Sequence, residues 1–244
     1  MTKDKLSVTK EMVSKYFQVE RVNTLADIYF RLLLSAQNAN MKARVIGGSI
    51  DGIENLGYIL CDFEPRDILK KYGNNTKSVF ADVKEKVKPR GRVNPHGLWA
   101  KYCETIISGA QFLGQFTSAE DFYKWADWFY EDERARPALP LLLKEEIKGF
   151  GLALSCDFLK ELGYLEYGKP DVWLRKILVS LELCSEEATD RELLMAIIRI
   201  AKNAGVTTYK VDKVFWLIGS GNFYMDNKKA RRSAERFIEF VKSQ

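Results

Sequence analysis

The hydrophobic positions of this chain recur mostly with the spacing of an amphipathic helix. Through most of the 244 residues, apolar side chains return about every three or four positions, which places them on one face of a helix. Alternation typical of a half-buried strand is weak and confined to 57–62 and 78–83. We therefore predict an all-α fold. The expected helices cover residues 9–17, 25–37, 65–72, 99–109, 119–130, 139–147, 153–162, 172–181, 190–204, 208–219 and 227–242.

Two of these helices begin at residues that favour an N-cap. Ser118 precedes an acidic first turn, and Asp190 opens the helix predicted for 190–204. The longest exposed connection is expected at 83–95, which contains two prolines, one glycine and five basic residues. This segment is interpreted either as a solvated basic loop, including a linker between lobes, or as a loop that contacts DNA.

A cluster of aromatic residues recurs at helical spacing in the helix predicted for 119–130. Such a stripe is more typical of a core than of a base-binding pocket, although one of its faces stacking on a nucleic-acid base is the alternative. The cluster consists of Phe122, Tyr123, Trp125, Trp128, Phe129 and Tyr130.

The composition is that of an ordinary soluble globular protein, with 46% hydrophobic and 29% charged residues. The net charge of +5 permits a nucleic-acid partner without requiring one. Cys61, Cys103, Cys156 and Cys184 lie far apart and form no C-x-x-C pair. Disulfides, a zinc site and a clustered four-cysteine iron–sulfur site are therefore not expected, and we predict no metal site.

Neither a signal peptide nor a membrane-spanning segment is expected. The N-terminal 17 residues are polar and charged without an apolar core. The chain also contains no run of about eighteen apolar residues, the length needed to span a bilayer. We therefore predict a cytoplasmic protein, associated with the nucleoid of a bacterium or archaeon, without a membrane partner.

The most informative segment is 145–177, which predicts a helix, a short hairpin, a second helix, a turn and a third helix. The hairpin contains Gly149, Phe150 and Gly151, and glycine allows a phosphate or another backbone to approach closely. The helix that follows adds its positive N-terminal end, which favours an anion. Asp171 lies about twenty residues further on, at the start of the third helix. A phosphate-binding turn with a carboxylate nearby suits chemistry on a nucleotide in DNA.

Two segments resemble the helix–hairpin–helix superfamily of DNA glycosylases. Residues 147–155, IKGFGLALS, are similar to the family's hairpin L-P-G-V-G-x-K-T-A. Residues 170–177, PDVWLRKI, are similar to its catalytic segment V-D-T-H-x-x-R-V, with Asp171 in register. Further similarity lies in LLSAQNAN at 33–40 and in VFWLIG at 214–219. The resemblance covers most of the chain in order, and its hairpin and aspartate segments are the specific ones.

This resemblance implies a two-lobed helical architecture with a DNA-binding groove between the lobes. We expect one lobe at about 25–135. The second lobe, at about 136–244 together with the N-terminal helix, would carry the hairpin and Asp171. The implied activity is hydrolysis of the N-glycosidic bond of a modified base that has been flipped out of double-stranded DNA. We expect a monomer.

The resemblance also assigns roles to individual residues. Asp171 would stabilise positive charge on the sugar as the bond breaks, although an Asp after Pro170 is also well suited simply to cap a helix. Gln37 and Asn38 would contact the gap or the orphaned base, and the alternative for Gln37 is a helix-end residue that faces solvent. Trp173 would stack on DNA or pack in the core. The hairpin would bind a backbone phosphate and, through its carbonyls, K⁺ or Na⁺; no other cofactor is expected. The residues assigned to this hairpin contact are Lys148, Gly149, Phe150, Gly151 and Ala153.

Ala153 departs from the family pattern in a way that bears on the reaction. Family members that also cleave the strand carry a lysine here, which forms a Schiff base with the sugar. Ala153 therefore predicts a monofunctional enzyme that leaves an abasic site. The alternatives are a bifunctional glycosylase/lyase with a displaced lysine (Lys144, Lys148 or Lys169), a non-catalytic DNA-binding protein, and a helical interaction protein that does not bind DNA.

The excised base does not follow from the sequence. The candidates are an oxidised purine such as 8-oxoguanine, an alkylated purine, a mismatched or deaminated base, and a hypermodified base of viral DNA. A damaged base would indicate base excision repair, and a viral base would indicate antiphage defence.

Overall fold

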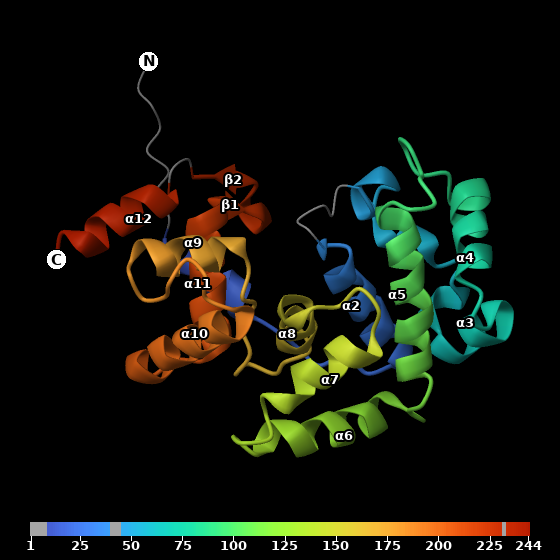
Figure 1. Ribbon diagram of the computed structural model, residues 1–244, viewed down its shortest axis with the longest axis horizontal. Helices are drawn as coiled ribbons and strands as arrows, with labels where there is room; N and C mark the ends of the chain where they lie inside the picture. The colour runs from blue at the N-terminus through green and yellow to red at the C-terminus, as the bar shows by residue number, and fades with distance from the viewer. Residues whose placement is uncertain (1–8, 40–44, 231–232) are drawn as a thin grey trace. The chain divides into compact units, whose positions relative to one another are not determined.

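The computed structural model describes residues 9–39, 45–230 and 233–244. Over these residues the chain is helical apart from two short strands, β1 (Asn222–Phe223) and β2 (Lys228–Lys229), which pair antiparallel (Figure 1). The predicted all-α fold is confirmed. No helix in the described ranges is long and apolar enough to cross a membrane.

The chain divides into two compact units. The central unit is Arg21–Leu162, and the terminal unit joins Met1–Glu20 to Gly163–Gln244. Helices α7 (Ala138–Glu146) and α8 (Leu152–Lys160) pack on α2 (Leu25–Ala36), α5 (Leu98–Leu113) and α6 (Ala119–Glu131). The segment 136–162, which the sequence analysis grouped with the C-terminal lobe, therefore belongs to the central unit.

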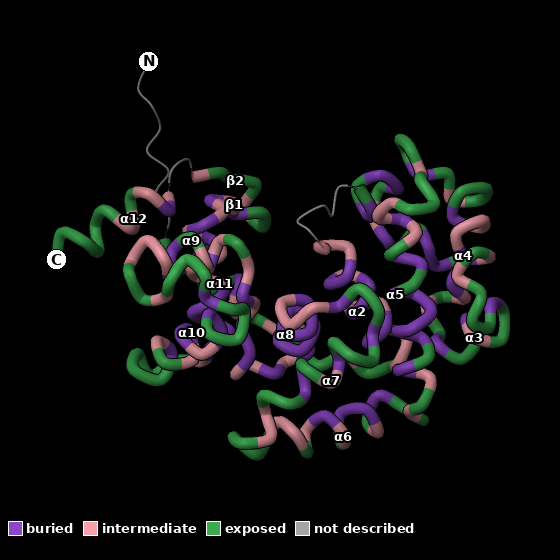
Figure 2. The backbone as a smooth tube through the Cα atoms, in the orientation of Figure 1, coloured by how far each residue is buried: buried purple, intermediate pink, exposed green. Residues whose placement is uncertain are grey.

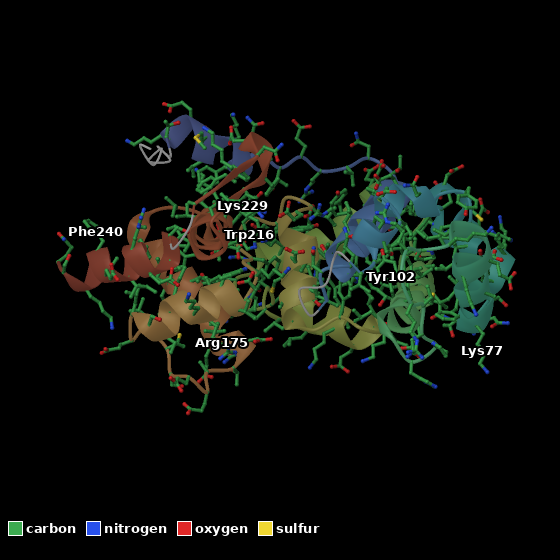
Figure 3. The ribbon with its side chains drawn as sticks, turned by 90° about the horizontal axis from the view of Figure 1, so that it is seen from above. Lys77, Tyr102, Arg175, Trp216, Lys229 and Phe240 are labelled. Atoms are coloured by element: carbon green, nitrogen blue, oxygen red, sulfur yellow. The ribbon has the colours of Figure 1, made fainter. Side chains whose placement is uncertain are left out.

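Helix α5 organises the core of the central unit, because α2, α3 and α4 all pack against it. Most of its residues are buried (Figure 2). Two tyrosine hydroxyls join it to α2. Tyr29 donates to the Ile106 carbonyl at 2.7 Å, and Tyr102, which is labelled in Figure 3, donates to the Leu33 carbonyl at 3.0 Å. The remaining elements of this unit are η3 (Gly47–Ser49), η4 (Ile53–Leu56), η5 (Cys61–Phe63), α3 (Pro65–Tyr72), α4 (Thr76–Asp82) and η6 (Val83–Val87).

Helix α11 (Thr208–Ser220) has the corresponding position in the terminal unit, where α9 (Val172–Ser180), α10 (Asp190–Ala204) and α12 (Ser233–Lys242) pack against it. The N-terminal elements α1 (Lys10–Ser14) and η1 (Lys15–Phe17) join this unit. Buried Tyr16 accepts a hydrogen bond from the Met225 amide in η7 (Tyr224–Asp226), and its carbonyl accepts one from the Tyr209 hydroxyl.

The weak alternation at 57–62 and at 78–83 does not correspond to a strand in the structure. Residues 78–83 lie in α4 and the start of η6, where Val79 and Val83 are buried one helical turn apart. Residues 57–60 form turns and residues 61–62 begin η5. The adjacent Ile59 and Leu60 are both buried, which excludes the alternation of a strand. Asp62, with a φ of 50°, also interrupts any extended backbone there.

Three further predictions need correction. The N-cap of α10 is Thr189 rather than Asp190, and Thr189 forms a capping box with Glu192. The last helix begins at Ser233 rather than at 227, because β2 occupies Lys228–Lys229. The predicted loop at 83–95 begins only at Lys88, where φ becomes 54° after a π-helical turn continues α4. Ser118 is confirmed as the N-cap of α6.

Candidate nucleic-acid interface

The predicted hairpin joins α7 to α8 in the central unit. Gly149 has a φ of +85°, a backbone conformation that residues with a side chain rarely adopt, so this position favours glycine strongly. Gly151 is the N-cap of α8 and has an ordinary extended backbone. Between them, Phe150 is buried and packs edge-on against Phe158 of α8, with ring centroids 6.3 Å apart. The buried ring of Phe150 anchors the turn, and the two glycines on either side of it remain accessible to solvent.

The hairpin and the first turn of α8 present unpaired amides. Within the described chain, four backbone N–H groups between residues 149 and 153 donate no hydrogen bond to protein. The first amides of a helix have no intrahelical partner and carry the positive end of its dipole, which makes them suited to an anion. The exposed side chain of Lys148 adds a charge beside them. The four amides belong to Gly149, Gly151, Leu152 and Ala153.

Two polar side chains of α5 hold the backbone of Lys148. Thr105 Oγ1 donates to the Lys148 carbonyl at 2.7 Å, and the Lys148 amide donates to Ser108 Oγ at 3.0 Å. Thr105 and Ser108 are both buried. Since proline has no N–H to donate, the second bond would be lost if position 148 held the proline of the resembling hairpin pattern. The hairpin is therefore fixed from α5 at the residue before Gly149.

Thr105→Val is expected to weaken DNA binding several-fold and to lower the free energy of unfolding by about 1–2 kcal/mol, because it leaves the Lys148 carbonyl without its buried donor. Ser108→Ala is expected to act similarly through the Lys148 amide. Thermal unfolding and the Kd for a duplex, measured together, check this. Thr105→Ser keeps the hydroxyl and is the matched control; equal losses in the serine and valine variants would show that the lost hydrogen bond is not the cause.

The resemblance implies a monovalent cation bound by backbone carbonyls of the hairpin, and the hydrogen bonds show which of these carbonyls are available. The carbonyls of Ile147, Lys148 and Gly151 each accept hydrogen bonds from protein. In the described chain, those of Gly149 and Phe150 accept none. These two oxygens would hold K⁺ or Na⁺, because carbonyl oxygens can replace part of the hydration shell of such an ion. No group of His, Cys, Asp or Glu with the arrangement of a metal site occurs among the described residues.

Asp171 lies in the terminal unit, where it caps α9. Its Oδ1 accepts hydrogen bonds from the amides of Trp173 at 2.9 Å and Leu174 at 3.0 Å. The preceding loop is held to α11, since the Lys169 amide donates to Oδ1 of buried Asp212 at 2.9 Å. The capping role weighed from the sequence is therefore present. It fixes the carboxylate at the start of the helix and is compatible with a second role toward a ligand.

Trp173 packs at least in part against α11. A Cβ added to Gly219 would lie 2.6 Å from Trp173 Cβ and 3.1 Å from its Cγ, so the absence of a side chain on Gly219 makes room for the indole. The side chain is half-buried. Packing of the indole beside Gly219 of α11 is observed, and contact with DNA stays a prediction.

Gln37 and Asn38 follow α2 in the central unit, on which α8 also packs. Gln37 is the C-cap residue of the helix, and its side-chain oxygen occupies the space beside Gly47 where a Cβ would otherwise lie. Asn38 Nδ2 donates to the Leu34 carbonyl at 3.2 Å. Both side chains are half-buried, and their contact with DNA stays a prediction. Asn40, their neighbour in the similar segment, lies outside the described residues.

The sequence did not predict the hydrogen bonds from α5 to Lys148 or a buried ion pair on α8. Lys160 Nζ lies 3.4 Å from Asp157 Oδ1, and both side chains are almost fully buried. With Ala153 they occupy positions i, i+4 and i+7, which share one face of a helix. That spacing was visible in the sequence, but the burial of the pair was not. The bonds from Thr105 and Ser108 join positions about forty residues apart, and no local pattern signals them.

Comparison with known proteins identifies the fold. No family model matches the chain, and no curated protein sequence matches it. The crystal structure of the Methanocaldococcus jannaschii 8-oxoguanine glycosylase/lyase, in complex with a 15mer DNA containing 8-oxoguanine, is similar over 89% of this chain and 93% of that chain. The TM-score is 0.59 and the sequence identity is 17%. The chain has the fold of this glycosylase/lyase. The similarity agrees with the all-α fold that the resemblance of the hairpin and aspartate segments implies.

Proposed function

We propose that the protein is a DNA N-glycosylase that removes a modified base from double-stranded DNA. The observation that carries the proposal is the hairpin at the start of α8, whose four unpaired amides are arranged for a backbone phosphate. The similarity in fold to a glycosylase/lyase crystallised with DNA supports the same activity. In this proposal the hairpin binds the phosphate beside the modified nucleotide, and the nucleotide leaves the duplex to reach the active site.

Asp171 is the proposed catalytic residue. Cleavage of the glycosidic bond develops positive charge on the sugar, and a fixed carboxylate stabilises that charge. Capping bonds from two amides hold this carboxylate in place, so little reorganisation is required when the charge develops. Gln37 and Asn38 are proposed to contact the gap left by the flipped base.

We further propose that the enzyme is monofunctional. Ala153, in the first turn of α8, has no nucleophile at the position where the resembling family carries its Schiff-base lysine. If the enzyme were a lyase, the structure would favour Lys160 as the nucleophile, because it lies on the same face of α8 as Ala153 and next to Asp157. A lyase that used Lys160 would form a covalent imine with the abasic sugar.

Base release from a panel of duplexes tests the activity. Each duplex carries one modified base, beginning with 8-oxoguanine because the similar structure binds it, and phage genomic DNA with hypermodified bases is included. A monofunctional enzyme yields strand breaks only after alkali treatment. Breaks without alkali, together with borohydride trapping that Lys160→Met abolishes and Lys148→Met does not, would replace this proposal by the lyase reaction.

The same panel distinguishes a glycosylase from the two non-enzymatic alternatives, a DNA-binding protein without catalysis and a protein that does not bind DNA. Tight, salt-sensitive binding to duplex DNA with no base released from any substrate would indicate a binding module. Absence of binding at low salt would indicate a protein whose partner is not DNA, because phosphate contacts are strongest when few competing ions are present. Release of a base from phage DNA alone would indicate antiphage defence rather than repair.

A further inference from the structure

Helix α6 has a charged outer face with one large aromatic side chain in it. Trp128 is 70% exposed, whereas the aromatic residues Phe122 and Tyr123 of the same helix are buried. Its exposed neighbours Glu120, Lys124 and Glu131 lie one or two turns away and are charged, and the adjacent Asp127 is half-buried. Burial in the core therefore does not explain the indole. We name this stripe the Trp128 face. It consists of Glu120, Lys124, Asp127, Trp128 and Glu131.

The Trp128 face borders a surface hollow of about 640 Å³ in the central unit. Arg21 occupies part of its wall, with its guanidinium 4.7 Å from the Tyr123 ring centroid. The same guanidinium makes two bonds to Asp127, at 2.6 and 3.0 Å. Stacking on an aromatic ring combined with a bidentate carboxylate contact is the favoured way of binding arginine.

A second aromatic residue of α6 already holds an arginine. The Arg136 guanidinium lies 4.9 Å from the Tyr130 ring centroid, and its Nε donates to the Tyr130 carbonyl at 2.8 Å. Trp128 is the exposed member of this aromatic series, and in the described chain no cation is stacked on it. Glu131 lies one turn further along, next to the indole, and forms no ion pair with a described residue.

The charges around Trp128 favour a cation. Arg21 neutralises Asp127, and the remaining Glu120 and Glu131 outnumber Lys124 on this face, although the whole chain has a net charge of +5. The face also ends at the negative C-terminal end of α6, whose last turn contains no basic residue. The same charges repel the phosphates of DNA, so a base stacked on Trp128 is disfavoured.

We propose that the Trp128 face binds an arginine-bearing segment of a partner protein. An arginine of the partner stacks on Trp128 and pairs with Glu131, repeating the contact that Arg21 makes with Tyr123 and Asp127. This interaction is independent of the proposed glycosylase activity, because none of the residues of the Trp128 face is assigned to the hairpin or to catalysis.

Fluorine NMR of the full chain labelled with 5-fluorotryptophan tests this proposal. The chain contains five tryptophans, and Trp128→Phe identifies the Trp128 resonance. The probe is an acetylated, amidated peptide of alternating glycine and arginine, and its citrulline analogue is the neutral control. The arginine peptide is expected to shift the Trp128 resonance saturably, and the citrulline peptide is expected to leave it unchanged.

Glu131→Gln is expected to weaken this binding about threefold, since an exposed ion pair and a cation–π contact each contribute modestly. Glu187→Gln removes the same charge from an exposed position in the terminal unit and is the matched control. Equal weakening by both variants, or no shift of Trp128, would overturn the proposal. So would a Trp128 shift caused by a single-stranded oligonucleotide, or by raising the protein concentration alone, which would indicate DNA or a second copy as the occupant.

Discussion

Asp171→Asn is expected to reduce base release about a thousandfold while leaving DNA binding and folding almost unchanged, because removing one group that stabilises transition-state charge commonly costs 10²–10³ in rate. Asparagine is about as good an N-cap as aspartate, so its side-chain oxygen can still accept the amides of Trp173 and Leu174. The substitution therefore removes the charge and keeps the cap. Single-turnover base release and thermal unfolding of the same preparation measure the two effects separately.

Two controls make this result specific. Asp171→Ala removes both charge and cap, and it should lose release as asparagine does while also unfolding about 1 kcal/mol more easily. Ser118→Ala removes the N-cap of α6 and should show the same loss of stability with normal release. If Asp171→Asn releases the base at the wild-type rate, Asp171 is only a cap and the catalytic proposal fails.

Gly149→Ala and Gly151→Ala are expected to differ, although both alter the same hairpin. A Cβ at Gly149 would lie 2.7 Å from Thr105 Oγ1 at a φ of +85°, so alanine should destabilise the protein by about 2 kcal/mol and also weaken DNA binding. A Cβ at Gly151 would meet no atom within 4 Å, and the backbone there is extended. Alanine at 151 should therefore cost less than about 1 kcal/mol of stability.

Measuring DNA binding distinguishes a glycine required by the backbone conformation from a glycine required for the approach of a phosphate. If the amides of the hairpin approach a phosphate, the methyl group of Gly151→Ala projects into space that the phosphate needs, and affinity should fall about tenfold, equivalent to about 1.4 kcal/mol. The Kd for a duplex and the thermal midpoint are the two measurements. Gly151→Ala with unchanged affinity would mean that the phosphate is bound elsewhere, whatever Gly149→Ala does.

The sequence predicted the elements that depend on local chemistry. Helical periodicity identified the helices, and the spacing of Gly149 and Gly151 identified a turn that the structure places between α7 and α8. The position of Asp171 at a helix start also followed from local residues, because Pro170 and a short acidic side chain favour an N-terminus. In each case the information lies within a few residues of the feature.

The errors and omissions came from contacts between distant residues. Residues 78–83 show weak strand-like alternation, but packing of α4 on α5 favours a helix there, with Val79 and Val83 buried one helical turn apart. The cap of α10 was placed one residue late because Asp190 and Thr189 are both suitable, and the reciprocal bonds with Glu192 decide between them. The bonds from α5 to Lys148 required the fold itself.

The four free cysteines include one partly exposed thiol in each unit, which allows the separation of the two units to be measured on the native chain. Cys103 and Cys156 are buried, and burial raises the pKa of the Cys103 thiol to about 12, so that thiol stays unreactive toward maleimides at neutral pH. Cys61 and Cys184 are partly exposed, the first in the central unit and the second in the terminal unit. A donor and an acceptor dye attached to this pair would follow by energy transfer how the two units respond when DNA binds, without any engineered cysteine.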